Sequence, residues 1–156
     1  MNRWFYFNLT VLIVAAWQVF QTFPSIPTHV LVGFIGLCFV LFNWTRHAVF
    51  STIRNTTDRK RKIKLANISK KIMPFHRWIG TSALVIISVH ALLVLDLFGF
   101  NWRNLKVVSG LLAGLILIAM VTTGWMRLVR PTGRKRKAHL YIGLSLFCFI
   151  AIHILL

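Results

Sequence analysis

The sequence predicts an all-α integral membrane protein, a single domain built as a bundle of five transmembrane helices. Three observations lead to this fold class. The 156 residues are 57% hydrophobic, which is more apolar surface than one small water-soluble domain can bury. The apolar residues gather in five runs of about 20 residues, the length that crosses a bilayer core as a helix. The basic residues, 19 Lys and Arg against 2 Asp and Glu, lie in clusters between these runs.

Each of the five apolar runs is near the length of a membrane span. The first is longer than the apolar core of a signal peptide, and no small-residue cleavage site follows it, so we expect it to be retained. The second is less uniform than the others because Arg46 and His47 enter its last turns. The predicted spans are residues 4–23, 26–50, 74–98, 106–126 and 138–156.

The basic clusters predict the orientation of the spans. If the spans alternate in direction, all but two of the 19 Lys and Arg residues lie on one side, and the exceptions are Arg103 and Lys106. The positive-inside rule then places the N-terminus and two basic loops in the cytoplasm, and we expect a bacterial cytoplasmic membrane. Membrane topology and anionic lipid explain the basic loops, which are also compatible with an acidic cytoplasmic partner; a nucleic-acid partner is not expected.

Several classes of chemistry are disfavoured by the composition. With only Asp58 and Asp96 as acids, catalysis by paired carboxylates is not expected. The cysteines, Cys38 and Cys148, lie inside apolar runs and form neither a redox C-x-x-C motif nor a C-x-x-C-H haem-attachment motif. The chain also contains no G-x-G-x-x-G or other nucleotide-binding segment.

An internal repeat carries four of the six histidines. Residues 76–93 read HRWIGTSALVIISVHALL and residues 139–156 read HLYIGLSLFCFIAIHILL, and the two segments match at eight of eighteen positions. In both, a histidine is followed by an aromatic residue, Ile and Gly, and then by a second histidine fourteen residues after the first.

This spacing predicts two level pairs of histidines. At ~100° per residue, two histidines fourteen positions apart face nearly the same side of a helix, and at ~1.5 Å per residue they lie roughly 21 Å apart along its axis. The third and fifth spans run in the same direction through the membrane. We therefore expect His76 and His139 to lie together near the inner face, and His90 and His153 to lie together near the outer face.

Two imidazoles from facing helices, repeated at two heights, suit bis-histidine ligation of two b-type haems. Gly80 and Gly143 follow the inner histidines by about one turn, where a missing side chain lets a flat ring approach the backbone. Zinc suits the pairs less well because no third or fourth ligand is nearby. Any one histidine can instead be a packing residue or part of a proton path, and the glycines can serve ordinary helix packing.

With these residues in place, the chain resembles the ferric reductase-like transmembrane domain family, which includes the membrane domains of NADPH oxidases and the haem-binding membrane subunit of the methionine sulfoxide reductase system. The matching residues are the four histidines and the HRWIG segment, and the resemblance covers nearly the whole chain. It implies that His76 and His139 hold the iron of an inner haem b, and that His90 and His153 hold an outer one. It further implies electron transfer from a cytoplasmic donor, through both haems, to an outer acceptor.

The chain departs from that family in two respects. The 156 residues contain neither the usual sixth span nor the flavin and nicotinamide domains of the full-length reductases. We therefore expect an oxidoreductase component that receives electrons from a flavoprotein reductase, a bound flavin (FMN or FAD) or a quinone pool. The alternatives are a quinol-linked dihaem cytochrome resembling the cytochrome b561 group, a haem-free structural membrane subunit and, less favoured, a proton or metal transporter.

The remaining polar residues give candidates for contacts to the haem propionates. Arg77 and Lys137 neighbour the inner histidines in sequence, and Arg103 and Lys106 break an outer face that is otherwise poor in cations. Interfacial snorkelling is the alternative for each of them. His29 and His47 have no partner at the repeat spacing, so we expect both to be interfacial polar residues, although His47 could shape a quinone or flavin pocket with Arg46.

Overall fold

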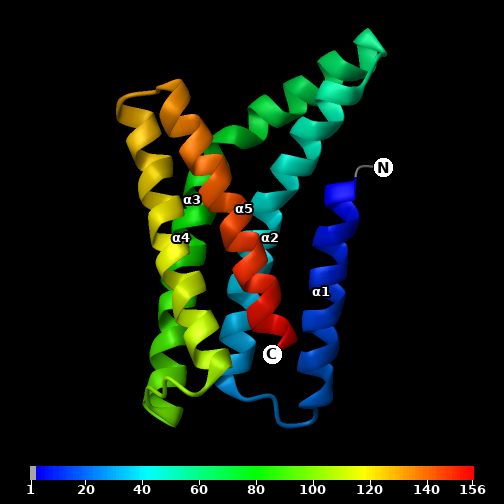
Figure 1. Cartoon of the computed structure of the whole chain (residues 1–156). Coiled ribbons are helices and arrows are strands. Elements are labelled where there is room, and N and C mark those ends of the chain that lie inside the picture. Colours follow the sequence, from blue (N-terminus) through cyan, green and yellow to red (C-terminus); the bar gives the residue numbers. More distant parts are fainter. Residues whose placement is uncertain (1–2) are drawn as a thin grey trace.

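The computed structural model describes residues 3–156, and these residues form five α-helices joined by short connections (Figure 1). All five helices are long and apolar enough to cross a membrane. The expected all-α class and the five apolar spans are thereby confirmed. The helices are α1 (Arg3–Gln21), α2 (Thr28–Asn55), α3 (Arg59–Phe98), α4 (Leu105–Val129) and α5 (Gly133–Leu155).

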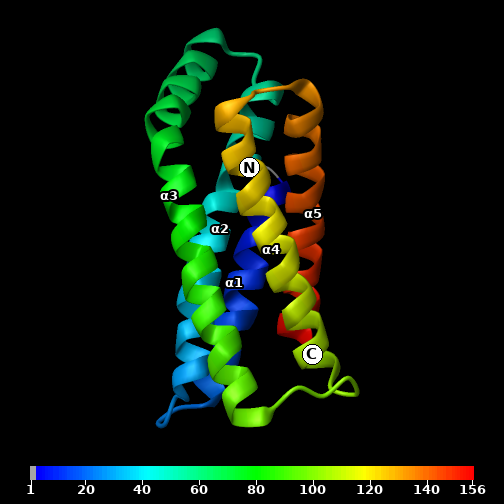
Figure 2. The same ribbon diagram turned by 90° about the vertical axis from the view of Figure 1, so that its left-hand side faces the viewer.

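The bundle consists of two closely packed antiparallel helix pairs and one additional helix. The most extensive contacts join α2 to α3 and α4 to α5, and α3 and α4 hold the two pairs together. Figures 1 and 2 show α3 and α5 running in the same direction on opposite sides of the bundle interior. α1 lies against α2 and touches α5, where the Gln18 side-chain amide donates a hydrogen bond to the Ile154 carbonyl oxygen.

The expectation of a long basic loop between the second and third spans is wrong. α2 continues to Asn55, and α3 already begins at Arg59. The Asp58 side chain caps α3 by accepting a hydrogen bond from the Lys60 amide, and the residues that follow are largely Lys, Arg and other good helix formers. The extended ends of α2 and α3 project beyond α4 and α5 as a basic helical hairpin (Figure 1).

The second basic loop is also shorter than expected. α4 ends at Val129 and α5 begins at Gly133, so most of the basic residues of this region lie on helices. Thr132 caps α5 by accepting a hydrogen bond from the Lys135 amide through its hydroxyl oxygen.

Pro74 lies inside α3 rather than at its start. Proline has no backbone N–H, so the helical hydrogen bond to the carbonyl of Lys70, four residues earlier, is missing, and the pyrrolidine ring crowds that carbonyl. Such a site bends a helix, and Figure 1 shows α3 changing direction in its first half. The basic hairpin therefore leans away from the bundle, while the rest of α3 packs within it.

A small apolar core fills the middle of the bundle. One residue from each of four helices meets there: Val40 of α2, Ala83 of α3, Leu117 of α4 and Leu146 of α5. Ala83 and Leu146 each lie seven residues after one repeat histidine and seven before the next. Outside the core, large apolar side chains are exposed on all five helices, as expected for a surface in contact with lipid.

Enlarging Ala83 should destabilise the bundle. Ala83 is only 1% exposed, so Ala83→Leu must push neighbouring helices apart at a cost of ~1–3 kcal/mol. The midpoint of thermal unfolding in detergent should fall clearly. Val85→Leu is the matched control because Val85 lies on the same helix with 59% of its surface exposed, and it should leave the midpoint nearly unchanged; equal effects of both variants would contradict this packing.

Candidate functional site

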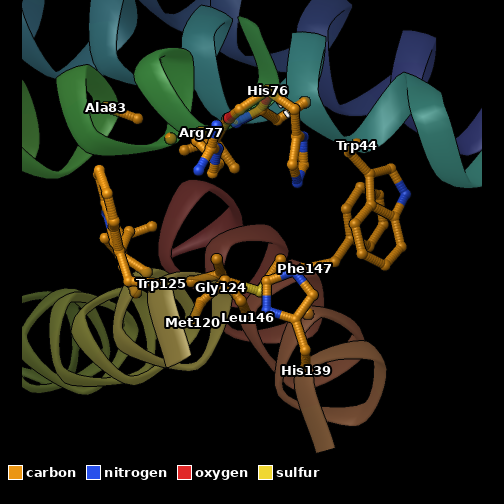
Figure 3. A pocket seen from close by; sticks show the side chains of 16 residues that line it. Trp44, His76, Arg77, Ala83, Met120, Gly124, Trp125, His139, Leu146 and Phe147 are labelled. Atoms are coloured by element: carbon orange, nitrogen blue, oxygen red, sulfur yellow. Dashed lines mark hydrogen bonds between the residues drawn. The ribbon is translucent and has the colours of Figure 1, made fainter. Parts of the chain in front are cut away.

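The structure brings together both pairs of histidines that the repeat predicts. The ring centroids of His76 on α3 and His139 on α5 lie 6.4 Å apart, with their planes at 81°. The ring centroids of His90 and His153, one level further along the same helices, also lie 6.4 Å apart, with planes at 75°. Figure 3 shows His76 and His139 facing one another across the interior.

This separation matches two imidazoles on one metal ion. When each ring binds the ion through a single nitrogen at ~2.0 Å, on opposite sides of it, the two ring centres lie about 6 Å apart. Rings turned toward lipid would be much further apart, whereas edge-to-face packing of two rings gives a similar separation. Among residues 3–156 no group of three or more His, Cys, Asp and Glu side chains gathers at a metal-binding distance, so the pairs offer two protein ligands each.

The Nδ1 atom of each of the four rings already has a hydrogen-bond partner. His90 donates to the carbonyl oxygen of His29 at 2.7 Å and His153 donates to that of Lys106 at 3.0 Å, because a carbonyl can only accept. The Thr123 hydroxyl is 3.1 Å from His139 Nδ1, and the Asn43 side-chain oxygen is 3.0 Å from His76 Nδ1. An engaged Nδ1 leaves Nε2 as the free nitrogen of each ring, which is the usual arrangement around a metal-bound histidine.

These partners follow the pairing of the helices. Both histidines of α3 are anchored by α2, and both histidines of α5 are anchored by α4. Each helix pair therefore orients its own two imidazoles, and the site forms where the two halves face each other.

Glycines on the anchoring helices make room for the rings. A Cβ atom at Gly33 of α2 would lie 2.8 Å from the His90 ring, and one at Gly110 of α4 would lie 2.8 Å from the His153 ring. A Cβ at Gly124 would meet His139 at 3.4 Å. None of these glycines belongs to the histidine repeat, which is why the sequence analysis did not single them out.

The predicted glycines, Gly80 and Gly143, both line a cavity beside the inner pair. In the structure their neighbours are side chains. A Cβ at Gly80 would lie 3.2 Å from Nδ2 of Asn43, and a Cβ at Gly143 would lie 3.1 Å from Met120 and 3.3 Å from Trp44. Because both positions lack a side chain, the neighbouring side chains that line this cavity can pack close to the backbone of α3 and α5.

The cavity beside the inner pair is partly open to the surroundings. It is bounded by α2, α3, α4 and α5, and its lining is mainly apolar. Trp44 and Phe147 stack on one side with ring centroids 5.0 Å apart, and Trp125 lies on the other (Figure 3). Arg77 also lines the cavity, with its guanidinium carbon 5.7 Å from the Trp125 ring centroid.

Positive charge surrounds the inner pair. Arg46 and Arg127 interact electrostatically with both His76 and His139. The Nε atom of Arg46 is buried and has no hydrogen-bond partner among residues 3–156, so this end of the site can accept an anionic group. Of the two cations predicted at this level, Arg77 lines the cavity and Lys137 is exposed in the first turns of α5. Arg127 was not among the predicted residues.

The predicted cations near the outer pair reach it to different degrees. Lys106 contributes its backbone carbonyl to His153 and interacts electrostatically with that ring. Arg103 lies exposed in the α3–α4 connection, where its backbone N–H donates to the Asn101 side chain.

His29 and His47 form no facing histidine pair in the structure. The His29 ring packs edge-on against Phe98, with centroids 5.5 Å apart, and its backbone carbonyl accepts the hydrogen bond from His90. The His47 ring lies between Trp4 and Trp44, with centroid distances of 4.7 and 5.1 Å.

Comparison of the chain with protein-family models, with curated proteins and with solved structures found no match. Function is therefore inferred from the geometry of the histidine pairs and their surroundings.

Adding one methyl group at Gly110 should disturb the outer pair. The new Cβ would lie 2.8 Å from the His153 ring, so the ring must move away from its partners, and the thermal unfolding midpoint of Gly110→Ala should fall. Gly114→Ala on the same helix is the control because nothing lies within 4 Å of its Cβ. That variant should be neutral or stabilising by up to ~1 kcal/mol through helix propensity, and a higher midpoint for Gly110→Ala than for Gly114→Ala would contradict the tight contact.

Proposed function

We propose that this protein is a b-type dihaem cytochrome of the membrane, similar to ferric reductase-like domains, that carries electrons from one side of the bilayer to the other. The observation that supports this proposal most is the presence of two facing imidazole pairs. In each pair the ring centroids lie 6.4 Å apart and both Nδ1 atoms are engaged elsewhere. Bound haem iron supplies reversible one-electron transfer.

The residues have distinct roles in this proposal. His76 and His139 hold the inner iron through their free nitrogens, and His90 and His153 hold the outer one. The mainly apolar lining of the cavity, with Gly80 and Gly143 in its walls, surrounds the inner group. The core around Ala83 and Leu146 lies between the two levels and keeps the path between them apolar and dry.

Arginines offer charge-assisted hydrogen bonds to the propionates of the inner group. Arg77 lines the cavity, and Arg46 has a buried, unpartnered Nε atom. Arg103 and Lys106 are the candidates at the outer level, and Lys137 remains a candidate at the inner level.

The membrane setting follows from the five apolar helices and their exposed apolar surface. We infer a bacterial cytoplasmic membrane, with the N-terminus and the basic hairpin of α2 and α3 in the cytoplasm. The electron donor is then a cytoplasmic flavoprotein or a bound flavin, and the acceptor is a redox partner on the outer side. Reduction of the purified protein by a quinol analogue alone would favour the quinol-linked alternative instead.

Haem quantitation on histidine variants tests the proposal directly. The wild-type protein, expressed with ample haem, should bind two haems per chain and show a low-spin bis-histidine spectrum. His90→Ala should lose only the outer haem and His139→Ala only the inner one, because each removes one axial ligand. His29→Ala is the matched control because it keeps the backbone carbonyl that anchors His90, and it should keep both haems.

Two outcomes would contradict this assignment. A wild-type protein without a Soret band would support a haem-free structural subunit. Two haems retained in His90→Ala would show that the pairing is wrong.

Removing the charge of Arg46 should affect the inner haem alone. Arg46→Gln takes away a positive charge that acts on both inner histidines, so the inner haem should bind more weakly and have a lower midpoint potential, since ferric iron carries the additional positive charge. A spectroelectrochemical titration measures both potentials. Arg54→Gln is the control because Arg54 is exposed near the end of α2; equal shifts in the two variants would exclude a specific role for Arg46.

A further inference from the structure

We propose that Asn43 is the positioning residue of the inner centre and that it determines which nitrogen of His76 faces His139. The side chain of Asn43 makes two hydrogen bonds to this one residue, which lies 33 positions later in the chain. An effect of Asn43 on a bound iron rests on the proposed function. The orientation of the His76 ring by Asn43 does not.

The two hydrogen bonds together fix the proton on His76. The amide nitrogen of Asn43 donates to the backbone carbonyl oxygen of His76 at 3.1 Å, and a carbonyl can only accept. This bond determines the orientation of the side-chain amide, so its oxygen is the atom 3.0 Å from His76 Nδ1. An amide oxygen also only accepts, and Nδ1 must therefore carry the hydrogen. Nε2 is left with its lone pair on the side of the cavity.

Gly80 leaves room for the two hydrogen bonds between Asn43 and His76, which together we call the clamp. A Cβ atom at position 80 would lie 3.2 Å from Nδ2 of Asn43, closer than a side chain normally packs. The absence of a side chain at position 80 lets the Asn43 amide reach the backbone of α3.

The clamp contacts α3 close to a point where that helix is weakened. Pro74, two residues before His76, removes one helical hydrogen bond and weakens the helix at this point. The bond from Asn43 to the His76 carbonyl ties α3 to α2 immediately after that weak point. Ring orientation and local backbone position therefore depend on the same side chain.

Two of the other three rings have anchors that a side-chain substitution cannot remove. His90 and His153 donate to backbone carbonyls, which persist whatever side chain their residue carries. The Thr123 hydroxyl that contacts His139 is itself held by the carbonyls of Ala119 and Met120. Of the four histidines, His76 thus has a mutable amide as its Nδ1 partner.

Three variants of the 156-residue chain separate positioning from simple packing. Asn43→Leu removes both bonds, so the inner haem should bind about 10-fold to 100-fold more weakly, and its midpoint potential should rise because the ligand becomes less basic. Asn43→Asp loses the donor to the His76 carbonyl but keeps an acceptor for Nδ1, now a charged and stronger one, so the potential should fall below that of the wild type while the inner haem is retained. Haem titration and spectroelectrochemistry measure the two quantities.

Ser109→Ala is the matched control at the outer level. Ser109 Oγ lies 3.3 Å from His153 Nδ1, but the Lys106 carbonyl lies closer, at 3.0 Å, so this variant should leave both haems and both potentials nearly unchanged. Potentials that move in the same direction in Asn43→Leu and Asn43→Asp, or inner binding that is unchanged in Asn43→Leu, would overturn the proposal.

A measurement on haem-free protein tests the role of Asn43 separately from the proposed haem-binding function. In haem-free protein with ¹⁵N-labelled histidine, NMR should find His76 protonated at Nδ1 in the wild type and in Ser109→Ala, and as a mixture of tautomers in Asn43→Leu. If the wild type binds no haem, the proposed function fails and this measurement alone decides the role of Asn43. A His76 ring that stays protonated at Nδ1 in Asn43→Leu would overturn that role.

Discussion

A buried imidazole has two nitrogens, and inside an apolar bundle both of them need a partner. The structure meets this requirement at Nδ1 for all four repeat histidines, using groups from a neighbouring helix. The two rings of each pair lie opposite one another, with centroids 6.4 Å apart. This one constraint links the close pairing of α2 with α3 and of α4 with α5 to the placement of the site between the two pairs.

The two levels of the site satisfy this constraint in different ways. At the outer level the anchors are the backbone carbonyls of His29 and Lys106, and glycines on α2 and α4 admit the rings. At the inner level the anchors are the side chains of Asn43 and Thr123, and arginines supply positive charge around them. The inner level therefore depends on more chemically distinct side chains, and it is there that the apolar cavity opens.

The features that depend on regular spacing could be predicted from the sequence. Helix periodicity and the 63-residue offset of the repeat were enough to predict that His76 meets His139 and that His90 meets His153. Hydropathy alone was enough for the five helices, because a long apolar run has few other stable structures.

What the sequence could not supply depends on contacts between non-equivalent helices. Asn43, Gly33 and Gly110 lie on α2 and α4, which carry no copy of the repeat, so no spacing rule connected them to the histidines. The basic segment after residue 50 was interpreted as a loop because hydropathy falls there. Charged residues also form helices when a cap such as Asp58 starts them, and the helix continued through Pro74 into the apolar span.

The anchoring of the outer pair has a consequence for how the protein can evolve. Every amino acid carries a main-chain carbonyl, so random replacement at positions 29 and 106 preserves the acceptors of His90 and His153. Most replacements at position 43 would remove the hydrogen bonds to His76, since few side chains present an acceptor and a donor side by side. Substitution at positions 29 and 106 should therefore leave the outer hydrogen-bond acceptors in place, whereas substitution at position 43 should remove the acceptor of His76.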